Sequence, residues 1–286
     1  MVFETDRARG RSLDKVTYDR ASILDMPNLQ QGDAHPGVSE VKNYLQRYGY
    51  LQKSLVTSPD IMDDPTSAAL KLVQKFNHLP ETGALDDATK GIMGKTRRGL
   101  PDILEQSIDS NISGPWQYRD LKYSFGNLTG RVPSEVCRGA VRRALDSWTS
   151  IGAGITFTEV PSSEPHDIFI EWRQASDPDH NMIGPILAHA DFPPGFSKIV
   201  KAPPLPLHFD NEEHVWVDGR VDGGFDIETT CLHEIGHCLG LYHSFVPESV
   251  MAPTAVPNDI KKRTLTSDDI NGIHSLYPRT GVIASG

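Results

Sequence analysis

The sequence is poor in cysteine. Its 286 residues include three cysteines, Cys137, Cys231 and Cys238, so no disulfide framework can be inferred. Cys231 and Cys238 stand seven residues apart in a predicted helix, too far along its axis for a bridge between them. We therefore expect the cysteines of this helix to be buried, small, apolar side chains.

Long apolar runs are also missing. No stretch approaches the ~20 apolar residues that a bilayer-spanning helix needs, so we predict no transmembrane segment. The first eleven residues lack the apolar core of a secretory signal. We expect either an intracellular protein or a secreted one whose leader was removed or never included.

Positive charge is in the minority. The 28 Lys and Arg side chains face 38 Asp and Glu side chains, which gives a net charge of −10. No basic run or stripe stands out to neutralise phosphates, and this argues against a nucleic-acid partner. The acidic surplus suits a protein that binds metal cations through carboxylates, although a solvated acidic surface is the more general explanation.

Hydrophobic periodicity divides the chain into four parts. Residues 1–34 are polar without periodicity and predict a loose tail. Residues 35–95 contain three short helical patterns, which predict a three-helix bundle with a small core. Residues 96–114 form a connector. Residues 115–280 mix alternating and helical patterns and predict the domain that carries the chemistry.

This last part predicts an α+β fold. Alternating apolar residues near 121–125, 155–157 and 168–172 indicate strands, and a helical pattern over 134–149 separates the first two. The order strand, helix, strand, strand points to a twisted mixed sheet with a helix packed on it. A final helix begins with Thr266-Ser267-Asp268-Asp269, whose side chains suit a helix N-terminus.

The stretch from His233 to His243 carries the strongest chemical pattern. In a helix, His233 and His237 are one turn apart and face the same side. Gly240 stands where a residue of positive φ would end the helix and bring His243 back as a third ligand. Three imidazoles with an open fourth position predict a catalytic zinc site, since a structural site normally has four protein ligands. Glu234 is placed to reach a water at that open position as a general base.

Each element of this pattern has a simpler explanation. A lone His on a helix is usually a surface or core residue, but the extended pattern fixes five positions in eleven, which favours a metal site. Met251 follows His243 by eight residues, the distance at which the metzincin zinc proteases carry a methionine turn beneath the metal. For one methionine alone, core packing is the alternative.

These residues make the chain resemble the matrixins, or matrix metalloproteinases, within the metzincins. The resemblance rests on the zinc string, Ser244, Met251 and the ending Leu265 to Ile273, with Leu187–Ala190 and His208–Glu213, and covers about 36–278. It implies a metzincin-like catalytic domain with a twisted mixed five-stranded sheet and packed helices. Upstream, residues 72–76 and 82–86 resemble the peptidoglycan-binding-like helical bundle of the matrixin pro-region, which implies a zymogen.

The resemblance also implies a second, structural zinc. His189 and His208 would be two of its ligands. In the family the other two come from a His-x-Asp loop, which is altered here to Asp177-Pro178-Asp179-His180. We expect His180 and one of the two aspartates, and choose Asp179.

A calcium site is implied next to it. Asp210 and Glu213 would supply carboxylate oxygens, the ligands that calcium prefers. Where the family has Phe-Asp-Gly-Pro, this chain has Met182-Ile183-Gly184-Pro185. One carboxylate is lost, so we expect calcium binding there to be weaker or absent.

The connector departs from the family at its most important position. Matrixins are kept latent by a cysteine thiolate on the zinc, in the pattern Pro-Arg-Cys-Gly-x-Pro-Asp, whereas Thr96 to Asp102 has Arg98 at the cysteine position. A guanidinium has no acceptor and stays protonated, so Arg98 cannot ligate zinc. Latency must then come from steric blockage or from another ligand such as Asp102.

We predict a zinc-dependent endopeptidase whose substrates are proteins or peptides. By resemblance, an extended substrate pairs with the strand near Leu187–Ala190, and the protein is monomeric and extracellular. The alternatives are a non-hydrolytic module whose bundle binds glycan or peptidoglycan, and a permanently latent proenzyme. The intact Glu234 argues against a binding module, because a scaffold needs no base beside its metal.

Overall fold

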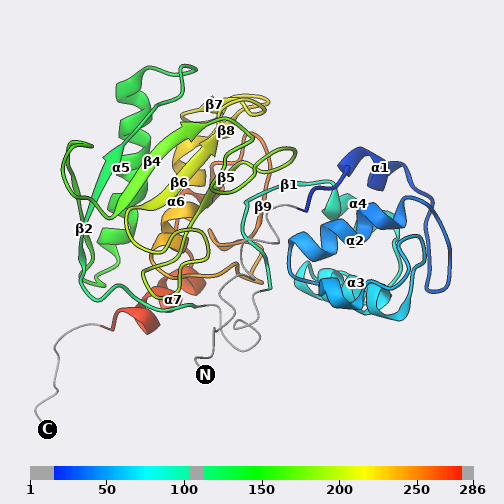
Figure 1. The fold of residues 1–286 in the computed structure, drawn as a ribbon. Helices are drawn as coiled ribbons and strands as arrows, with labels where there is room; N and C mark the ends of the chain where they lie inside the picture. The colour runs from blue at the N-terminus through cyan, green and yellow to red at the C-terminus, as the bar shows by residue number, and fades with distance from the viewer. Residues whose placement is uncertain (1–15, 104–111, 279–286) are drawn as a thin grey trace, which may run out of the picture.

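The computed structural model describes residues 16–103 and 112–278, which form two units side by side (Figure 1). A smaller helical unit and a larger unit built on a sheet each have their own apolar core. The α+β class and the N-terminal helices predicted from the sequence are confirmed. None of the described helices combines the length and apolar character needed to cross a bilayer.

In residues 16–103, the helical unit contains four α-helices and one 3₁₀ turn. Asp63 and Asp86 cap two of the helices by accepting hydrogen bonds from Thr66 N and Thr89 N. The elements are α1 Arg20–Asp25, α2 Val38–Arg47, η2 Lys53–Leu55, α3 Asp64–Phe76 and α4 Asp87–Met93.

Helix α1 corrects the prediction of a loose tail over residues 1–34. Ile23, Met26 and Leu29 are buried in the core of the helical unit, and Leu29 forms a bridge with Leu85. A helix of six residues is too short to give a periodic signal. The tail prediction is therefore wrong for residues 16–34, and residues 1–15 lie outside the described part of the chain.

The larger unit contains a five-stranded mixed sheet in the order β3-β2-β4-β6-β5. The pairs β2–β3, β2–β4 and β4–β6 are parallel, and the edge strand β5 runs antiparallel to β6. The strands of the sheet and the three described α-helices of this unit are, in chain order, β2 Asp120–Phe125, α5 Ser134–Ser150, β3 Thr156–Glu159, β4 Ile168–Arg173, β5 Ala188–Ala190, β6 Leu205–Asp210, α6 Ile227–Cys238 and α7 Ser267–Leu276.

Short elements complete this unit. Strand β1 of the connector pairs with β9, and β7 pairs with β8. They are β1 Thr96–Arg97, β7 Trp216–Val217, β8 Phe225–Asp226, β9 Thr254–Ala255 and η3 Lys261–Arg263. The predicted final helix is confirmed as α7, where Thr266 and Asp269 form a capping box.

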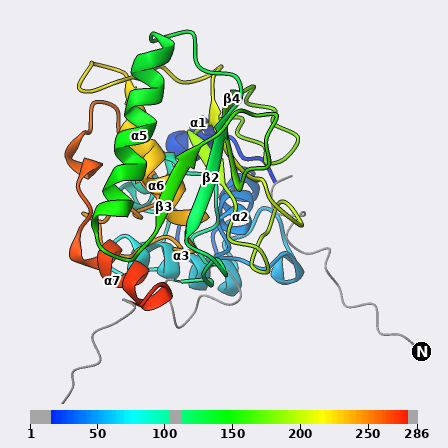
Figure 2. The same ribbon diagram turned by 90° about the vertical axis from the view of Figure 1, so that its left-hand side faces the viewer.

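Helices α5 and α6 pack against each other and against the sheet (Figure 2). The indole Nε1 of Trp148 on α5 donates to Leu232 O of α6 at 2.9 Å. The cysteines are free and buried, as predicted for those of α6. Helix α6 is therefore held between α5 and the sheet.

Asp226 fixes the start of α6. Its carboxylate accepts hydrogen bonds from Thr229 N at 2.9 Å and Gly219 N at 2.8 Å, and it pairs with Arg263. Burial alone would raise the pKa of Asp226, but the hydrogen bonds from Arg263 and Thr229 hold that pKa below its ordinary value. The ionised carboxylate therefore stabilises the folded state.

We predict that Asp226→Ala lowers the free energy of unfolding by about 2 to 4 kcal/mol, because it removes both a helix cap and a buried ion-pair partner. Asp226→Asn is the matched control, since it keeps the cap and loses the charge, and should cost less. Urea unfolding would measure both.

The same pair predicts a pH dependence. The folded-state pKa of Asp226 is depressed, so its charge stabilises fully above the unfolded pKa of about 4 and less as the pH falls below it. The stability difference between wild type and Asp226→Asn should shrink between about pH 4 and pH 2. A difference that stays constant over this range would contradict the assignment.

Candidate metal centre and the connector that covers it

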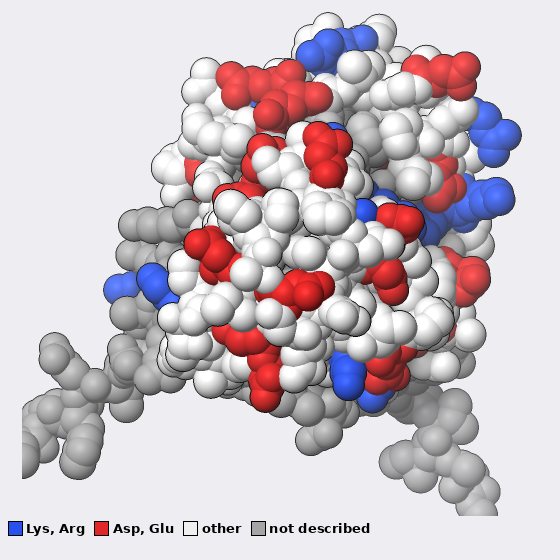
Figure 3. Space-filling model, turned by 90° about the vertical axis from the view of Figure 1, so that its right-hand side faces the viewer, with Lys and Arg blue, Asp and Glu red and all other residues white. Residues whose placement is uncertain are grey.

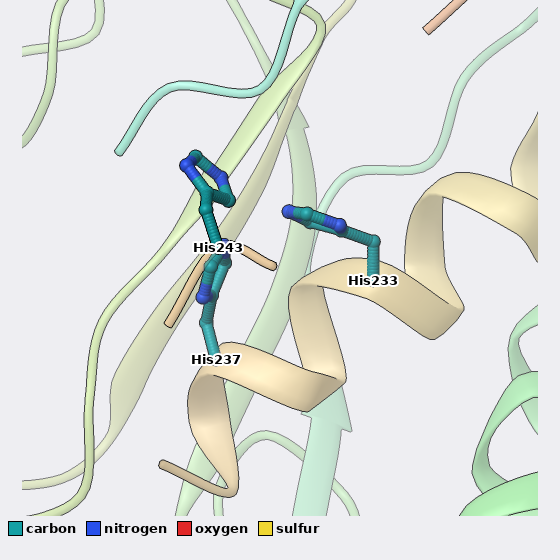
Figure 4. Close-up of side chains that lie close together, drawn as sticks. All are labelled: His233, His237 and His243. Atoms are coloured by element: carbon teal, nitrogen blue, oxygen red, sulfur yellow. The ribbon is translucent and has the colours of Figure 1, made fainter. Parts of the chain in front are cut away.

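Three histidines converge at the C-terminal end of α6. The helix supplies His233 and His237, and Gly240, with φ 106°, turns the chain so that His243 faces them, as predicted (Figure 4). One nitrogen from each ring lies within 4.8 Å of the others, and the side chains are buried. A Cβ at position 240 would lie 2.6 Å from Gly114 O, so the turn has room for glycine alone.

Each of these imidazoles is oriented by a hydrogen bond at Nδ1. His233 bonds Val250 O and His237 bonds Leu241 O, both at 2.7 Å, and His243 bonds Asp102 Oδ1 at 2.8 Å. A carbonyl oxygen only accepts, so Nδ1 of His233 and His237 carries the proton and Nε2 keeps its lone pair.

The Nε2 atoms of the three rings are buried and have no hydrogen-bond partner among the described residues. Burial lowers the pKa of each ring, which keeps the ring neutral. Neutral imidazoles with Nδ1 held from behind and Nε2 turned to a common point form the donor set of a zinc site. The residues therefore fit the metal that the sequence pattern predicts.

Glu234 follows the first histidine on α6 and is fully buried. Neither carboxylate oxygen has a hydrogen-bond partner among the described residues. Burial raises the pKa of Glu234 to about 8, and the charge of Arg98 acts in the opposite direction. An unbonded carboxylate with a raised pKa beside this centre has the properties of a general base.

Met251 packs directly beneath the helix. A Cβ added at Gly236 would overlap the Met251 sulfur, and Met251 O accepts a hydrogen bond from Ser244 N at 2.9 Å. Ser249 Oγ accepts from Met251 N at 3.0 Å. The methionine thus lies under the turn that carries His243, as the sequence pattern predicts for the floor of the site.

A second group of donors lies on the sheet. His189 on β5 and His208 on β6 are directly opposite each other, and Asp177 Oδ2 bonds both rings, at 3.0 and 2.6 Å. All three side chains are buried, with donor atoms within 4.8 Å of one another. Burial favours the uncharged form of Asp177, but the hydrogen bonds from the two histidines lower its pKa overall.

The aspartate in this group differs from the one we chose. Asp179 is 40% exposed and pairs with Arg173, while its carboxylate lies 3.9 Å from His208 Nδ1. The predicted His180 is buried, and its Nε2 bonds Gly99 O of the connector at 2.9 Å, outside the three-donor group. The altered loop spacing left this choice open, because a loop does not fix side-chain direction from sequence.

Asp210 and Glu213 lie at the end of β6 and hold a neighbouring loop. Asp210 Oδ1 accepts from Glu212 N at 2.8 Å, and Glu213 Oε2 accepts from Gly184 N at 2.7 Å. Burial raises the pKa of Asp210 to about 6. Asp210 and Glu213 thus lie in one loop. Among the described residues, neither of them belongs to a group of three or more carboxylate or histidine donors.

The connector runs between two segments of the larger unit, residues 185–188 and Pro253, and we call the space between these two segments the groove. On one side Arg97 N bonds Pro185 O at 2.7 Å, Leu187 N bonds Arg97 O at 2.9 Å and Gly99 N bonds Ala188 O at 2.9 Å. On the other side Arg98 N bonds Pro253 O at 3.0 Å. The connector thus pairs with the edge at β5 where we expect an extended substrate, which supports latency by steric blockage.

Asp102 anchors the connector. It pairs with the buried Arg97, accepts from Tyr50 OH at 2.6 Å and bonds His243 Nδ1 at 2.8 Å. The guanidinium of Arg97 also lies over the ring of Tyr48, 3.9 Å from its centroid. Asp102 therefore lies behind His243, on the side away from Nε2, and the suggestion that it replaces the cysteine as a metal ligand is not supported.

The side chain of Arg98 is buried against the chain segment that follows Met251. It is 1% exposed, and its Nη1 donates to Ala252 O at 2.8 Å and Thr254 O at 3.3 Å. Burial lowers the pKa of Arg98 to about 10, and the Glu234 carboxylate partly offsets this. The connector therefore carries a buried guanidinium whose charge and that of Glu234 act on each other.

Comparisons with known proteins find two matching family models. A family model described as Matrixin matches residues 115–278, and one described as Putative peptidoglycan binding domain matches residues 34–93. Matrilysin of Rattus norvegicus is 38% identical over 244 residues, which cover 83% of this chain and 84% of that protein.

Longer relatives match as well. Matrix metalloproteinase-19 of Homo sapiens is 35% identical over 249 residues, which cover 84% of this chain and 46% of the relative. Matrix metalloproteinase-16 of Rattus norvegicus is 33% identical over 260 residues, 83% of this chain and 41% of the relative. The chain thus spans less than half the length of these two proteins.

The buried pair Arg97–Asp102 predicts a large stability effect. Arg97→Met should lower the free energy of unfolding by about 3 to 5 kcal/mol, because it leaves a buried carboxylate without its cation. Arg143→Met is the control: that guanidinium is 44% exposed and also paired, and it should cost about 1 kcal/mol or less. Equal losses in chemical denaturation would show that the pair does not anchor the connector.

Proposed function

Since the chain belongs to the matrixin family, we propose that it is a zinc-dependent endopeptidase, held latent by its own connector. The family resemblance predicted from the sequence is confirmed by the matches to Matrixin and to matrix metalloproteinases. The observation that supports the activity best is the convergence of three buried imidazoles whose Nε2 atoms have no partner among the described residues, next in the chain to a glutamate whose oxygens also have none.

His233, His237 and His243 would hold the zinc through Nε2. Zinc bound by three histidines lowers the pKa of a water toward ~7 and polarises a carbonyl. Glu234 accepts the proton of the attacking water and delivers it to the leaving amine. Val250 O, Leu241 O and Asp102 hold the rings in position throughout.

The substrate would bind where the connector lies. The connector uses backbone groups of Pro185, Leu187 and Ala188 on one side and Pro253 on the other. An extended peptide could form the same bonds without restricting its own sequence, so side-chain preference must come from contacts beyond the backbone. We propose proteins or peptides as substrates, once the connector leaves.

Further metals are part of the proposal. His189, His208 and Asp177 would hold a structural zinc, and the bond from Nδ1 of His208 would break in favour of the metal. Asp210 and Glu213 would bind calcium together with loop carbonyls. By analogy with the named relatives, we propose action on an extracellular matrix.

A glycan-binding module is the alternative, and the match of residues 34–93 to a peptidoglycan-binding description is what favours it. The outer face of the helical unit shows many Asp and Glu side chains, with Lys and Arg toward its rim (Figure 3). Pull-down of the full chain by peptidoglycan, with and without the Asp63→Ala change in this unit, would test it.

The activity proposal predicts the effect of Glu234→Gln. Peptide hydrolysis by the chain after proteolysis in the connector should fall by about 10² to 10⁴, because the proton acceptor is lost. Zinc content should not change. Glu228→Gln, on the same helix but paired with Arg143 and Arg263, should leave the rate within a factor of about two of wild type. A Glu234→Gln enzyme at the parent rate would disprove the assigned base, and activity absent before and after proteolysis would indicate permanent latency.

The metal proposal predicts zinc content by mass spectrometry after dialysis. His237→Ala and His189→Ala should each lose one zinc per chain, and the double variant should lose both, because each group needs its imidazoles. His274→Ala is the control, because the His274 ring belongs to neither donor group and instead bonds the carbonyl of Ile151 at the C-terminal end of α5. An unchanged zinc content in His237→Ala would exclude the three-histidine site.

A further inference from the structure

Arg98 places a positive charge inside the same buried space as the three histidines. Its guanidinium comes from the connector, and Nη1 donates to Ala252 O at 2.8 Å. Ala252 is two residues after Val250, whose carbonyl bonds Nδ1 of His233, and it follows Met251, which packs against α6 at Gly236. Since the imidazoles are where a metal cation would bind, the guanidinium and the metal would share one region of low polarity.

Among the described residues, few negative charges act on Arg98. Nη1 of Arg98 donates to two backbone carbonyls, and Nε has no hydrogen-bond partner among the described residues. Asp102, the buried carboxylate that bonds Nδ1 of His243, is already paired with Arg97. Of the two carboxylates whose charge acts on Arg98, Glu234 and Asp259, Glu234 acts more strongly and lies next to His233 in the chain. One carboxylate would then face both a guanidinium and a divalent cation, which repel each other strongly where water is excluded.

The seat of the connector does not depend on Arg98 alone. The Arg97–Asp102 pair and the backbone bonds of Arg97, Arg98 and Gly99 hold the connector in the groove. The connector can therefore stay in place while it carries an unfavourable charge toward the metal site.

We propose that Arg98 makes connector seating and metal binding at the three histidines mutually antagonistic, so that metal loading promotes release of the connector. The inference rests on the proposed metal site. It goes beyond that proposal because it states that connector seating and metal binding weaken each other. Coupling of this kind is reciprocal: the seated connector weakens metal binding by the same factor by which the metal weakens seating. A thiolate at position 98 would give the opposite sign, since it binds zinc.

The first test measures metal affinity of the full chain. Titration of the metal-free protein with Co²⁺, followed by visible absorbance, should show that Arg98→Met binds about tenfold tighter than wild type or better, as expected when a like charge is removed from a buried site. R98Q is a second neutral variant and should behave like R98M. R98K keeps the charge and should stay near wild type. The His237→Ala chain gives the contribution of the Asp177 group, which is subtracted.

A control separates charge from loosening of the interface. Arg47 is a buried arginine of the helical unit that donates to Asn181 O of the larger unit at 2.6 Å and to Val16 O at 2.9 Å. Neither partner belongs to the three-histidine group. R47M should leave the Co²⁺ affinity of wild type unchanged. Equal affinity in wild type, R98M and R98Q, or an equal gain in R47M, would overturn the proposal.

The second test reads the reciprocal effect by hydrogen exchange. The amides of Arg97, Arg98 and Gly99 are bonded across the groove, and Zn²⁺ should speed their exchange in wild type, with intact mass showing that the chain is uncleaved. In R98M the zinc effect should vanish, and in R98C it should reverse to slower exchange. Slower exchange in wild type would overturn the proposal. If neither wild type nor R98M binds metal at the three histidines, the proposed function fails and the inference with it.

Discussion

The burial of charge around the end of α6 is the constraint on which the rest of the structure depends. Three imidazoles, Glu234, Asp102 and two guanidinium groups lie in one region that is nearly closed to water. Buried charges are stable only when they are paired or bonded to polar groups. Asp102 forms the ion pair that neutralises the buried charge of Arg97, and it also orients His243 through a hydrogen bond. The connector and the candidate metal site therefore share one carboxylate.

This sharing explains how the two units stay together. The connector forms backbone hydrogen bonds to both sides of the groove, while Arg97 extends its side chain back to Tyr44 and Tyr48 of the helical unit. A second contact packs Phe76 of α3 against Phe245, with ring centroids 4.1 Å apart and ring planes tilted by 37°. The helical unit thus holds the connector from one side and covers the chain after His243 from the other.

The group on the sheet illustrates a different balance. His189 and His208 face each other because β5 and β6 are antiparallel and in register at these positions. Asp177 comes from a loop and reaches both rings. Strand pairing places the two histidines opposite each other once the sheet forms. The position of the third donor depends instead on the path of a loop. Donors on loops therefore vary more readily than donors on strands.

The sequence by itself determined the family, the fold class, the three-histidine pattern and the positive φ of Gly240, because helical spacing and the freedom of glycine are local properties. It also excluded Arg98 as a metal ligand, since the chemistry of a guanidinium does not depend on the fold. Only the tertiary structure decided that residues 16–34 join the helical core, that Asp177 rather than Asp179 meets the histidines, and that Asp102 lies behind His243. Each of these depends on side chains far apart in the sequence, whose meeting is set by packing and by the pairing of buried charge rather than by local periodicity.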